Sequence, residues 1–305
     1  MTGILEGIIK KLENRIIENN GVVDIHYIAD FIRELQQHEY DAHVCIMGQN
    51  GNGKSITMLA LMKLLDENSI KNGQIVYAYD TTSRLVSLLR DMKSSVIGID
   101  EAKKFFHYKL GMTTEQIVLT NMIEYARENK NAFIVCTNDI RRLNNNYRNA
   151  KVQLVIWLLD RFEDGDVKSY GLVFVGNPAL EEEDKFQMNA FANLYSFESI
   201  RLVAEGLPTF FGYLFIDDIE TYITPEELNM YRENKKKGII DAANKSLEKL
   251  AQKEAGLLNA KSYEAAYFNQ LAANRLENEN ENPLYDFEEQ QFFKRAGSWR
   301  KNELK

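Results

Sequence analysis

The chain has 305 residues, of which 45% are hydrophobic and 27% are charged, so it can bury a sizeable core as one large domain or two smaller ones. Its net charge of −8 argues against a protein that coats nucleic acid by bulk electrostatics, but it does not exclude a local basic channel. The apolar runs are far shorter than the ~20 residues that span a bilayer, and charges fill the N-terminus where a signal peptide would be apolar. We therefore expect no direct membrane insertion and a cytoplasmic location.

Two helices are expected before the first strand. Residues 1–21 place apolar side chains at helical spacing and end at Asn20–Gly21, and residues 24–38 repeat the pattern. The first helix has one apolar stripe, made of Ile4, Leu5, Ile8, Ile9, Leu12 and Ile16. We expect residues 1–40 to form an N-terminal helical segment.

From residue 41 onward, strand-like runs alternate with amphipathic helices. Strands are expected at 43–47, 74–79, 95–100, 132–137 and 152–159, and helices at 54–67, 83–92 and 114–129. Such alternation predicts an α/β fold with a mostly parallel sheet and helices on both of its faces. Asp164–Gly165 separates two strand-like runs, 152–159 and 169–176, which predicts that the sheet ends in an antiparallel hairpin.

After Pro178 the alternation stops. Residues 224–255 open with Thr224 and with Glu227 three residues later, which is a helix-capping pattern, and then run long and polar. We expect a core domain at 41–178 followed by a mainly helical C-terminal region at 179–305.

The sequence GQNGNGKS at 48–55 directly follows a strand and precedes an apolar helix, the context in which this motif binds phosphate. Its glycines let the backbone N–H groups curl toward phosphate oxygens. Lys54 should reach the β- and γ-phosphates, and Ser55 should offer its hydroxyl to Mg²⁺. The residues expected to bind ATP are Gly48, Gln49, Asn50, Gly51, Asn52, Gly53, Lys54, Ser55 and Ile56.

The sequence VIGIDEA at 96–102 supplies two acids at the end of a strand. Asp100 is placed to hold the Mg²⁺ shell, and Glu101 is placed to polarise the attacking water. Simple nucleotide switches and many small-molecule kinases lack a glutamate here. Glu101 therefore favours hydrolysis of ATP over phosphoryl transfer to another acceptor.

Asn138 and several arginines are further candidates. Asn138 follows the strand at 132–137, where it would orient water or report on phosphate release, although an asparagine also suits an ordinary turn. A guanidinium inserted from a neighbouring subunit would neutralise charge on the γ-phosphoryl group. Surface solubility is the alternative role for each candidate arginine. The candidates are Arg127, Arg141, Arg142 and Arg148.

The series GQNGNGKS, VIGIDEA, EYARENKN (124–131) and AFIVCTND (132–139) resembles the additional-strand P-loop ATPases. It is most similar to the FtsK/HerA superfamily of DNA-pumping motors, which includes viral genome-packaging ATPases. The resemblance covers about residues 40–178 and implies a RecA-like P-loop NTPase sheet. It also implies that Arg127, at the end of the helix after the two acids, acts on the ATP of a neighbouring subunit.

One position departs from that superfamily. Its members often carry glutamine after the fourth strand, where this chain has Asn138. Asparagine there is closer to AAA+ ATPases and to some large terminase subunits, which are also packaging motors. No acidic set after Pro178 resembles a terminase nuclease, so a packaging motor built on this chain would lack cutting activity.

Two basic segments could contact nucleic acid. In AKKFFHYKLG (102–111), the basic residues Lys103, Lys104, His107 and Lys109 are interleaved with Phe105, Phe106 and Tyr108, a mixture that suits phosphate contacts and base packing. An amphipathic helix start, with its aromatic residues in the core, fits this segment equally well. In ENKKKG (233–238), a solvated helix face is favoured.

These features predict an ATP- and Mg²⁺-dependent motor that works as a homo-oligomeric ring on double-stranded DNA. Viral genome packaging, with a portal or capsid as partner and a location in the host cytoplasm, fits this reading. So does mobile-element transfer with a membrane coupling partner. The alternative is an AAA+-like assembly factor, an initiator or transposition helper, whose helical lid with a second sensor arginine would lie in 183–305. A kinase-like P-loop enzyme fits least well, because of Glu101.

Overall fold

The computed structural model describes residues 2–107, 121, 123, 126–163, 166–177, 184–215, 219–244, 247–248 and 252. The chain divides into two compact units, residues 1–240 and 241–305. In the second unit, the described residues 241–244, 247–248 and 252 are helical. Among the described residues, no helix combines the length and apolar character needed to cross a membrane.

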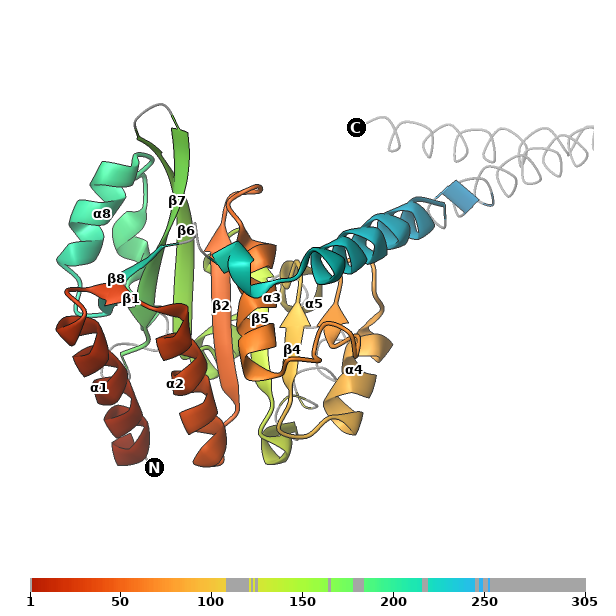
Figure 1. The fold of residues 1–305 in the computed structure, drawn as a ribbon, viewed down its shortest axis with the longest axis horizontal. Coiled ribbons are helices and arrows are strands. Elements are labelled where there is room, and N and C mark those ends of the chain that lie inside the picture. Colours follow the sequence, from red (N-terminus) through yellow and green to blue (C-terminus); the bar gives the residue numbers. More distant parts are fainter. Residues whose placement is uncertain are drawn as a thin grey trace, which may run out of the picture. The chain divides into compact units, whose positions relative to one another are not determined.

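The first unit is built on one eight-stranded sheet with the order β1-β8-β7-β6-β2-β5-β4-β3 (Figure 1). Its strands are β1 (Val22–Val23), β2 (Ala42–Gly48), β3 (Ile75–Val76), β4 (Val96–Ile99), β5 (Ala132–Thr137), β6 (Leu154–Glu163), β7 (Asp166–Val175) and β8 (Phe210–Phe215). The neighbouring strands β6, β2, β5, β4 and β3 are parallel to one another. Strand β7 is antiparallel to both β6 and β8. The expected mostly parallel α/β sheet is confirmed.

Strand β5 lies between the strand that carries the phosphate loop and the strand that carries the two acids. Residue pairs Met47–Thr137 and Ile99–Val135 are opposite each other, so β2, β4 and β5 end close together at one edge of the sheet. Strand β5 is therefore inserted between the two strands that carry the expected site motifs. It separates the loop from the acids and places the residues after β5 between them.

Helices cover both faces of the sheet, as expected. They are α1 (Thr2–Glu18), α2 (Ile25–Gln37), α3 (Lys54–Leu65), α4 (Thr82–Asp91), α5 (Lys103–Phe106), α7 (Asn145–Ala150), α8 (Phe197–Glu205) and residues 225–240. Shorter 3₁₀ turns are η2 (Ala126–Asn129), η3 (Ile140–Arg142), η5 (Met188–Phe191) and η6 (Ile219–Tyr222). One apolar core lies under α1, α2 and α3 and includes Ile46 of β2. The other lies under α4, α7 and α8 and includes Cys45, whose side chain points the opposite way.

The N-terminal segment is part of this unit. Of the predicted stripe, Ile8, Leu12 and Ile16 are buried in the core shared with α2 and β2, whereas Ile4 is exposed. Val22–Val23 then joins the sheet beside β8. The boundary expected at residue 40 therefore does not separate compact units, because the stripe of α1 is buried only by packing on the rest of the unit.

The region after Pro178 contains a strand that the sequence analysis missed. Phe210–Phe215 (FFGYLF) forms β8 and pairs with β7, so the boundary expected at residue 178 falls inside the sheet. The predicted hairpin is present, with Glu163 opposite Asp166. It does not end the sheet, because β8 and β1 lie beyond β7 in the strand order. The aromatic run after Pro208–Thr209 was the available signal.

Two other predicted elements differ from the structure. The strand expected at 74–79 is reduced to Ile75–Val76, because the Asp80 carboxylate accepts a 2.8 Å hydrogen bond from the Tyr77 N–H and closes a turn. The helix expected at 114–129 lies mostly outside the described residues, and its last four residues form η2.

Candidate active site

The phosphate loop leaves the sheet at the end of β2 and is fixed by its neighbours. Gly48 has a φ of 152°, and a Cβ at this position would lie 2.6 Å from the Leu158 carbonyl oxygen of β6. The buried Asn52 side chain donates a 3.2 Å hydrogen bond to the same carbonyl. The loop is therefore anchored to β6, and its backbone approaches that strand too closely for any residue but glycine at 48.

The remaining predicted nucleotide-binding residues lie along the loop and the first turn of α3. Gln49, Asn50 and Gly51 are exposed, and Gly53, with a φ of 79°, is the N-cap of α3. Ser55 and Ile56 are half-buried in the first turn of α3. The N-terminus of this helix, with its unpaired N–H groups, thus faces the space enclosed by the loop, as phosphate binding requires.

Lys54 is buried, and its ammonium folds back onto the loop. Its Nζ donates hydrogen bonds of 2.9 Å to the Gly48 carbonyl and 2.7 Å to the Gln49 carbonyl. Burial lowers its pKa from the usual range, while the carboxylates of Glu101 and Asp100 act in the opposite direction. Phosphate oxygens are stronger acceptors for an ammonium than these carbonyls, so the side chain is available to a bound nucleotide.

Asp100 directly follows β4 and meets the phosphate loop. Its carboxylate is almost fully buried, and its Oδ1 accepts a 3.2 Å hydrogen bond from the Ser55 hydroxyl. The turn after it is held to β5 by a 2.7 Å bond from the Ala102 N–H to the Cys136 carbonyl. A hydroxyl and a carboxylate converge here, and such oxygen donors fit Mg²⁺, which takes its other ligands from water and phosphate.

Glu101 and Asn138 occupy the ends of the two neighbouring strands. Glu101 has a φ of 62°, in the left-handed region that is sparsely populated by residues with a Cβ. Asn138 follows β5, and its buried Oδ1 has no hydrogen-bond partner among the described residues. An unmatched buried acceptor costs about 1–3 kcal/mol, so this oxygen suits a water or ligand donor at the site.

Two site residues were missed by the sequence analysis: Tyr231 and Lys235, both from the helix at residues 225–240. The Tyr231 hydroxyl donates a 2.8 Å hydrogen bond to Asp100 Oδ2, and the Lys235 ammonium lies 2.7 Å from the same oxygen. Lys235 belongs to the ENKKKG segment, for which a solvated face was favoured, and for this residue that interpretation is wrong. The four-residue spacing of Glu227, Tyr231 and Lys235 was the available signal, because it puts all three on one face of the helix.

The candidate arginines are spread over several elements. Arg127 lies in η2, and its side chain is outside the described part of the chain. Arg142 is exposed, and Arg141 forms an ion pair with Asp139, with Nη2 3.0 Å from Oδ2. Arg148, on α7, is half-buried. Of the three arginines whose side chains are described, Arg141 pairs with Asp139 and Arg142 is exposed, so these two do not gather at the site of their own chain.

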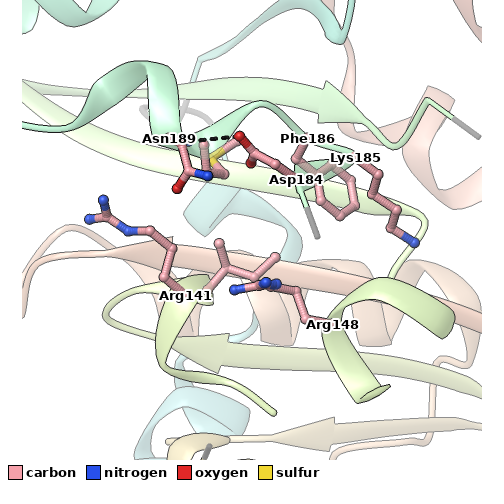
Figure 2. A pocket seen from close by; sticks show the side chains of 8 residues that line it. Arg141, Arg148, Asp184, Lys185, Phe186 and Asn189 are labelled. Atoms are coloured by element: carbon pink, nitrogen blue, oxygen red, sulfur yellow. Dashed lines mark hydrogen bonds between the residues drawn. The ribbon is translucent and has the colours of Figure 1, made fainter. Parts of the chain in front are cut away.

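Arg141 and Arg148 line a pocket whose lining includes no residue of the phosphate loop. Figure 2 shows them on one side of the pocket, with Asp184, Lys185 and Asn189 on the other. Asp184 accepts a 3.2 Å hydrogen bond from the Asn189 N–H, drawn as a dashed line in Figure 2. Three cationic side chains thus share this pocket with one carboxylate.

The basic segment after the two acids is only partly described, and its two described phenylalanines are in the core. Phe105 and Phe106 are buried, and the Phe106 ring stacks on Tyr147 with 4.0 Å between centroids. The Lys104 ammonium donates a 2.7 Å hydrogen bond to the Asp80 carbonyl. These phenylalanines cannot stack on bases, so the nucleic-acid interpretation is wrong for them. Tyr108 and Lys109 lie outside the described residues.

Together, the glycine-rich loop on a central strand, the acids one strand away and the inserted β5 define a P-loop ATPase site. Residues 44–158 match the family model of the "ATPase family associated with various cellular activities (AAA)". This segment runs from β2 through β4 and β5 into β6 and contains the phosphate loop, the two acids and Asn138, but not Tyr231 or Lys235. Residues 44–158 therefore form a P-loop ATPase domain, which binds ATP and hydrolyses it.

Comparison with solved structures gives several similar chains. The N-terminal domain of zonular occludens toxin from Neisseria meningitidis is 12% identical, with a TM-score of 0.37 over 60% of this chain and 98% of that one. The genome packaging NTPase B204 from Sulfolobus turreted icosahedral virus 2 is 16% identical, with a TM-score of 0.30 over 44% and 91%. The flagellar accessory protein FlaH from Methanocaldococcus jannaschii is 13% identical, with a TM-score of 0.29 over 46% and 87%. None of the curated proteins compared with the chain matches it.

Proposed function

We propose that the chain is the subunit of a homo-oligomeric, Mg²⁺-dependent motor that uses ATP hydrolysis to move double-stranded DNA, as in viral genome packaging or mobile-element transfer. The observation that carries this proposal is the distribution of positive charge. The described cations beside Asp100 are Lys54 and Lys235, whereas Arg141 is held by Asp139 and Arg148 lines a separate pocket. An arginine for the transition state would therefore come from another subunit.

In the proposed reaction the N–H groups of the phosphate loop and Lys54 hold the phosphates of ATP. Ser55 and Asp100 would hold Mg²⁺, which neutralises negative charge on the β- and γ-phosphate oxygens when bound. Glu101 accepts a proton from the attacking water, and Asn138 supplies a carbonyl oxygen that can orient that water. Arg127 of a neighbouring subunit is our candidate for the cation that stabilises charge on the γ-phosphoryl group.

For DNA binding we propose the pocket of Arg141, Arg148 and Lys185 in place of the segment at 102–111. Phosphate contacts need an excess of positive charge, and three cationic side chains line this pocket against two carboxylates, Asp184 in its lining and Asp139 paired with Arg141. Such contacts carry no base information, which suits a motor that steps along any sequence. Repeated around a ring, the pocket would give a basic surface to subunits that are acidic overall.

The test is ATP turnover with and without double-stranded DNA at several salt concentrations. We expect DNA of unrelated sequences to stimulate turnover, with the stimulation falling as salt rises because counterions are released on binding. The double variant Arg148→Ala/Lys185→Ala should lose most of this stimulation and keep its basal turnover. The control Lys10→Ala/Lys71→Ala removes two exposed charges elsewhere and should behave as wild type. Wild-type protein that hydrolyses ATP without responding to any DNA would contradict the proposal.

The helix at 225–240 favours a second candidate function. It brings Lys235 to the nucleotide site within one chain, as the lid of an AAA+-like assembly factor brings its sensor residue. Such a factor would assemble on DNA and partners without translocating. It predicts little stimulation, or stimulation confined to one preferred DNA site, in the experiment described above.

A further inference from the structure

The carboxylate of Asp100 is fully engaged in this structure. Its Oδ1 accepts a 3.2 Å hydrogen bond from the Ser55 hydroxyl. Its Oδ2 accepts two hydrogen bonds, at 2.8 Å from the Tyr231 hydroxyl and at 2.7 Å from the Lys235 ammonium. Tyr231 and Lys235 also contact each other, with 3.2 Å between hydroxyl oxygen and Nζ. The Asp100 side chain is 4% exposed, and that of Lys235 is 36% exposed. A resident cation thus already neutralises this buried carboxylate.

Mg²⁺ and Lys235 would both be cations at the same carboxylate. Ser55 and Asp100 would hold Mg²⁺, which takes oxygen ligands, and the Lys235 ammonium already lies 2.7 Å from Asp100 Oδ2. Two cations held this close to one carboxylate also repel each other. Binding of Mg²⁺ therefore requires Lys235 to leave Oδ2, and the Tyr231 hydroxyl, a donor to the same atom, loses part of its acceptor.

The helix that carries these two residues is held differently at its two ends. At its start, the Glu227 carboxylate accepts from the Thr224 N–H at 3.0 Å and from Lys63 of α3 at 2.5 Å. Further along, Tyr231 contacts Asp100 and is also buried in the apolar core, with its ring 5.7 Å from that of Tyr77, and the Tyr79 hydroxyl donates a 2.7 Å bond to the Asn234 carbonyl. Glu227 and the core contacts thus hold the helix independently of the nucleotide site, whereas Lys235 is attached through Asp100 and the Tyr231 hydroxyl.

We propose that Lys235 is a resident counter-ion that Mg²⁺ replaces at Asp100, and that Mg²⁺–nucleotide thereby releases residues 231–240 from the site. The nucleotide-free state holds the helix on the site, and the loaded state frees it. This makes the helix a reporter of site occupancy. The inference concerns the nucleotide site alone and does not depend on DNA as the substrate.

The first test measures binding of fluorescent ADP to the full chain with Mg²⁺ and, separately, with EDTA. ADP is used because it has no γ-phosphate, so contacts to that group do not contribute to the measured affinity. Lys235→Ala should tighten binding about fivefold in Mg²⁺, the scale of one partly exposed charged hydrogen bond, and should leave binding in EDTA unchanged. Lys236→Ala and Lys237→Ala remove exposed charges from the same run and should match wild type in both conditions.

Two outcomes would overturn the proposal. Weaker binding of Lys235→Ala in both conditions would make Lys235 a phosphate ligand, and an effect equal to that of Lys236→Ala would make it a surface lysine. Tyr231→Phe provides a second variant that keeps the ring and loses the hydroxyl. It should tighten Mg²⁺-dependent binding in the same direction but by less, and a loss of binding would contradict the competition.

The second test follows the helix itself by hydrogen–deuterium exchange. In wild-type protein, the backbone amides of residues 231–240 should exchange faster with Mg²⁺ and ADP than with ADP and EDTA. Residues 25–37 of α2, on the same face of the sheet, provide an internal reference that should not change. Equal exchange in the two conditions, or slower exchange with Mg²⁺, would show that the helix is not released.

Discussion

Lys54 and Glu101 have different proposed roles: Lys54 binds the phosphates, and Glu101 acts on the attacking water. We predict that Lys54→Ala abolishes nucleotide binding, because its ammonium supplies ground-state contacts to phosphate. Glu101→Gln should keep ATP binding and lower turnover about 10²–10⁴-fold, because the carboxylate acts on the water only in the transition state. Fluorescent-nucleotide titration and phosphate release measure the two effects separately. A Glu101→Gln protein that turns over at the wild-type rate would remove Glu101 from the catalytic role.

Gly48 sets the path of the phosphate loop. At Gly48→Ala the new Cβ would lie 2.6 Å from the Leu158 carbonyl oxygen, and the φ of 152° is itself unfavourable for alanine. We expect a loss of about 2–4 kcal/mol in the free energy of unfolding, together with loss of nucleotide binding. Gly7→Ala on α1 is the control, since a Cβ there has open space, and it should keep stability and binding. Normal ADP binding by Gly48→Ala would contradict this role.

The sequence predicted the residues of the site that belong to a contiguous motif. Ser55 lies directly after Lys54, and Asp100 ends a strand, so their meeting follows from parallel strands ending at one edge of the sheet. The contact of Lys235 with Asp100 spans 135 positions and depends on how a polar helix packs. Only its four-residue spacing from Tyr231 distinguishes the half-buried Lys235 from the exposed Lys236 and Lys237.

At the level of elements, local rules succeeded where a pattern was complete. The capping residues Thr224 and Glu227 form the reciprocal hydrogen bonds that their spacing predicted. The Glu227 N–H donates to the Thr224 hydroxyl at 3.3 Å, and the Thr224 N–H donates to the Glu227 carboxylate at 3.0 Å. Strand β8 was missed because FFGYLF has aromatic residues on both faces and a glycine within it, so it lacks a strand period. Its pairing with β7 is decided by the sheet and not by the segment itself.

The start of β2 is tied to β6 and α7 by a buried polar cluster. The His43 ring lies 3.1 Å from both the Asp41 carboxylate and the Tyr147 hydroxyl, and Lys151 approaches the same carboxylate at 3.4 Å. Burial alone would raise the pKa of Asp41, but the hydrogen bond from His43 and the charges of His43 and Lys151 hold it well below its usual range. Burial lowers the pKa of His43, against the opposing effect of Asp41.

These shifts predict that stability falls on acidification. Both folded-state pKa values lie below the unfolded ones, so the unfolded chain binds more protons and is favoured as pH decreases. The contribution of His43 should be lost below about pH 6.5 and that of Asp41 below about pH 4. Urea unfolding between pH 8 and pH 3.5 measures the slope. Asp41→Asn should be less stable at pH 7 and show a shallower slope below about pH 4, and an unchanged slope in that range would contradict the assignment.

For the whole molecule, the proposed arginine from a neighbouring subunit predicts assembly. We predict that Arg127→Ala and Lys54→Ala are each inactive alone and regain turnover when mixed, because an intact site can use an arginine from a partner whose own site is dead. The mixture should recover up to about a quarter of wild-type activity for random pairing of neighbours. Sizing chromatography must show mixed oligomers. Mixed oligomers without activity would place Arg127 in an in-cis or structural role.

The central claim is that ATP hydrolysis moves this protein along double-stranded DNA, and displacement of a third strand tests it most directly. A triplex-forming oligonucleotide is bound far from a free duplex end, and its release is followed by fluorescence. We predict release that requires ATP and Mg²⁺, that is delayed in proportion to the distance from the end, and that is absent with Glu101→Gln. Release without delay or without hydrolysis, or no release by protein that hydrolyses ATP on the same DNA, would contradict the account.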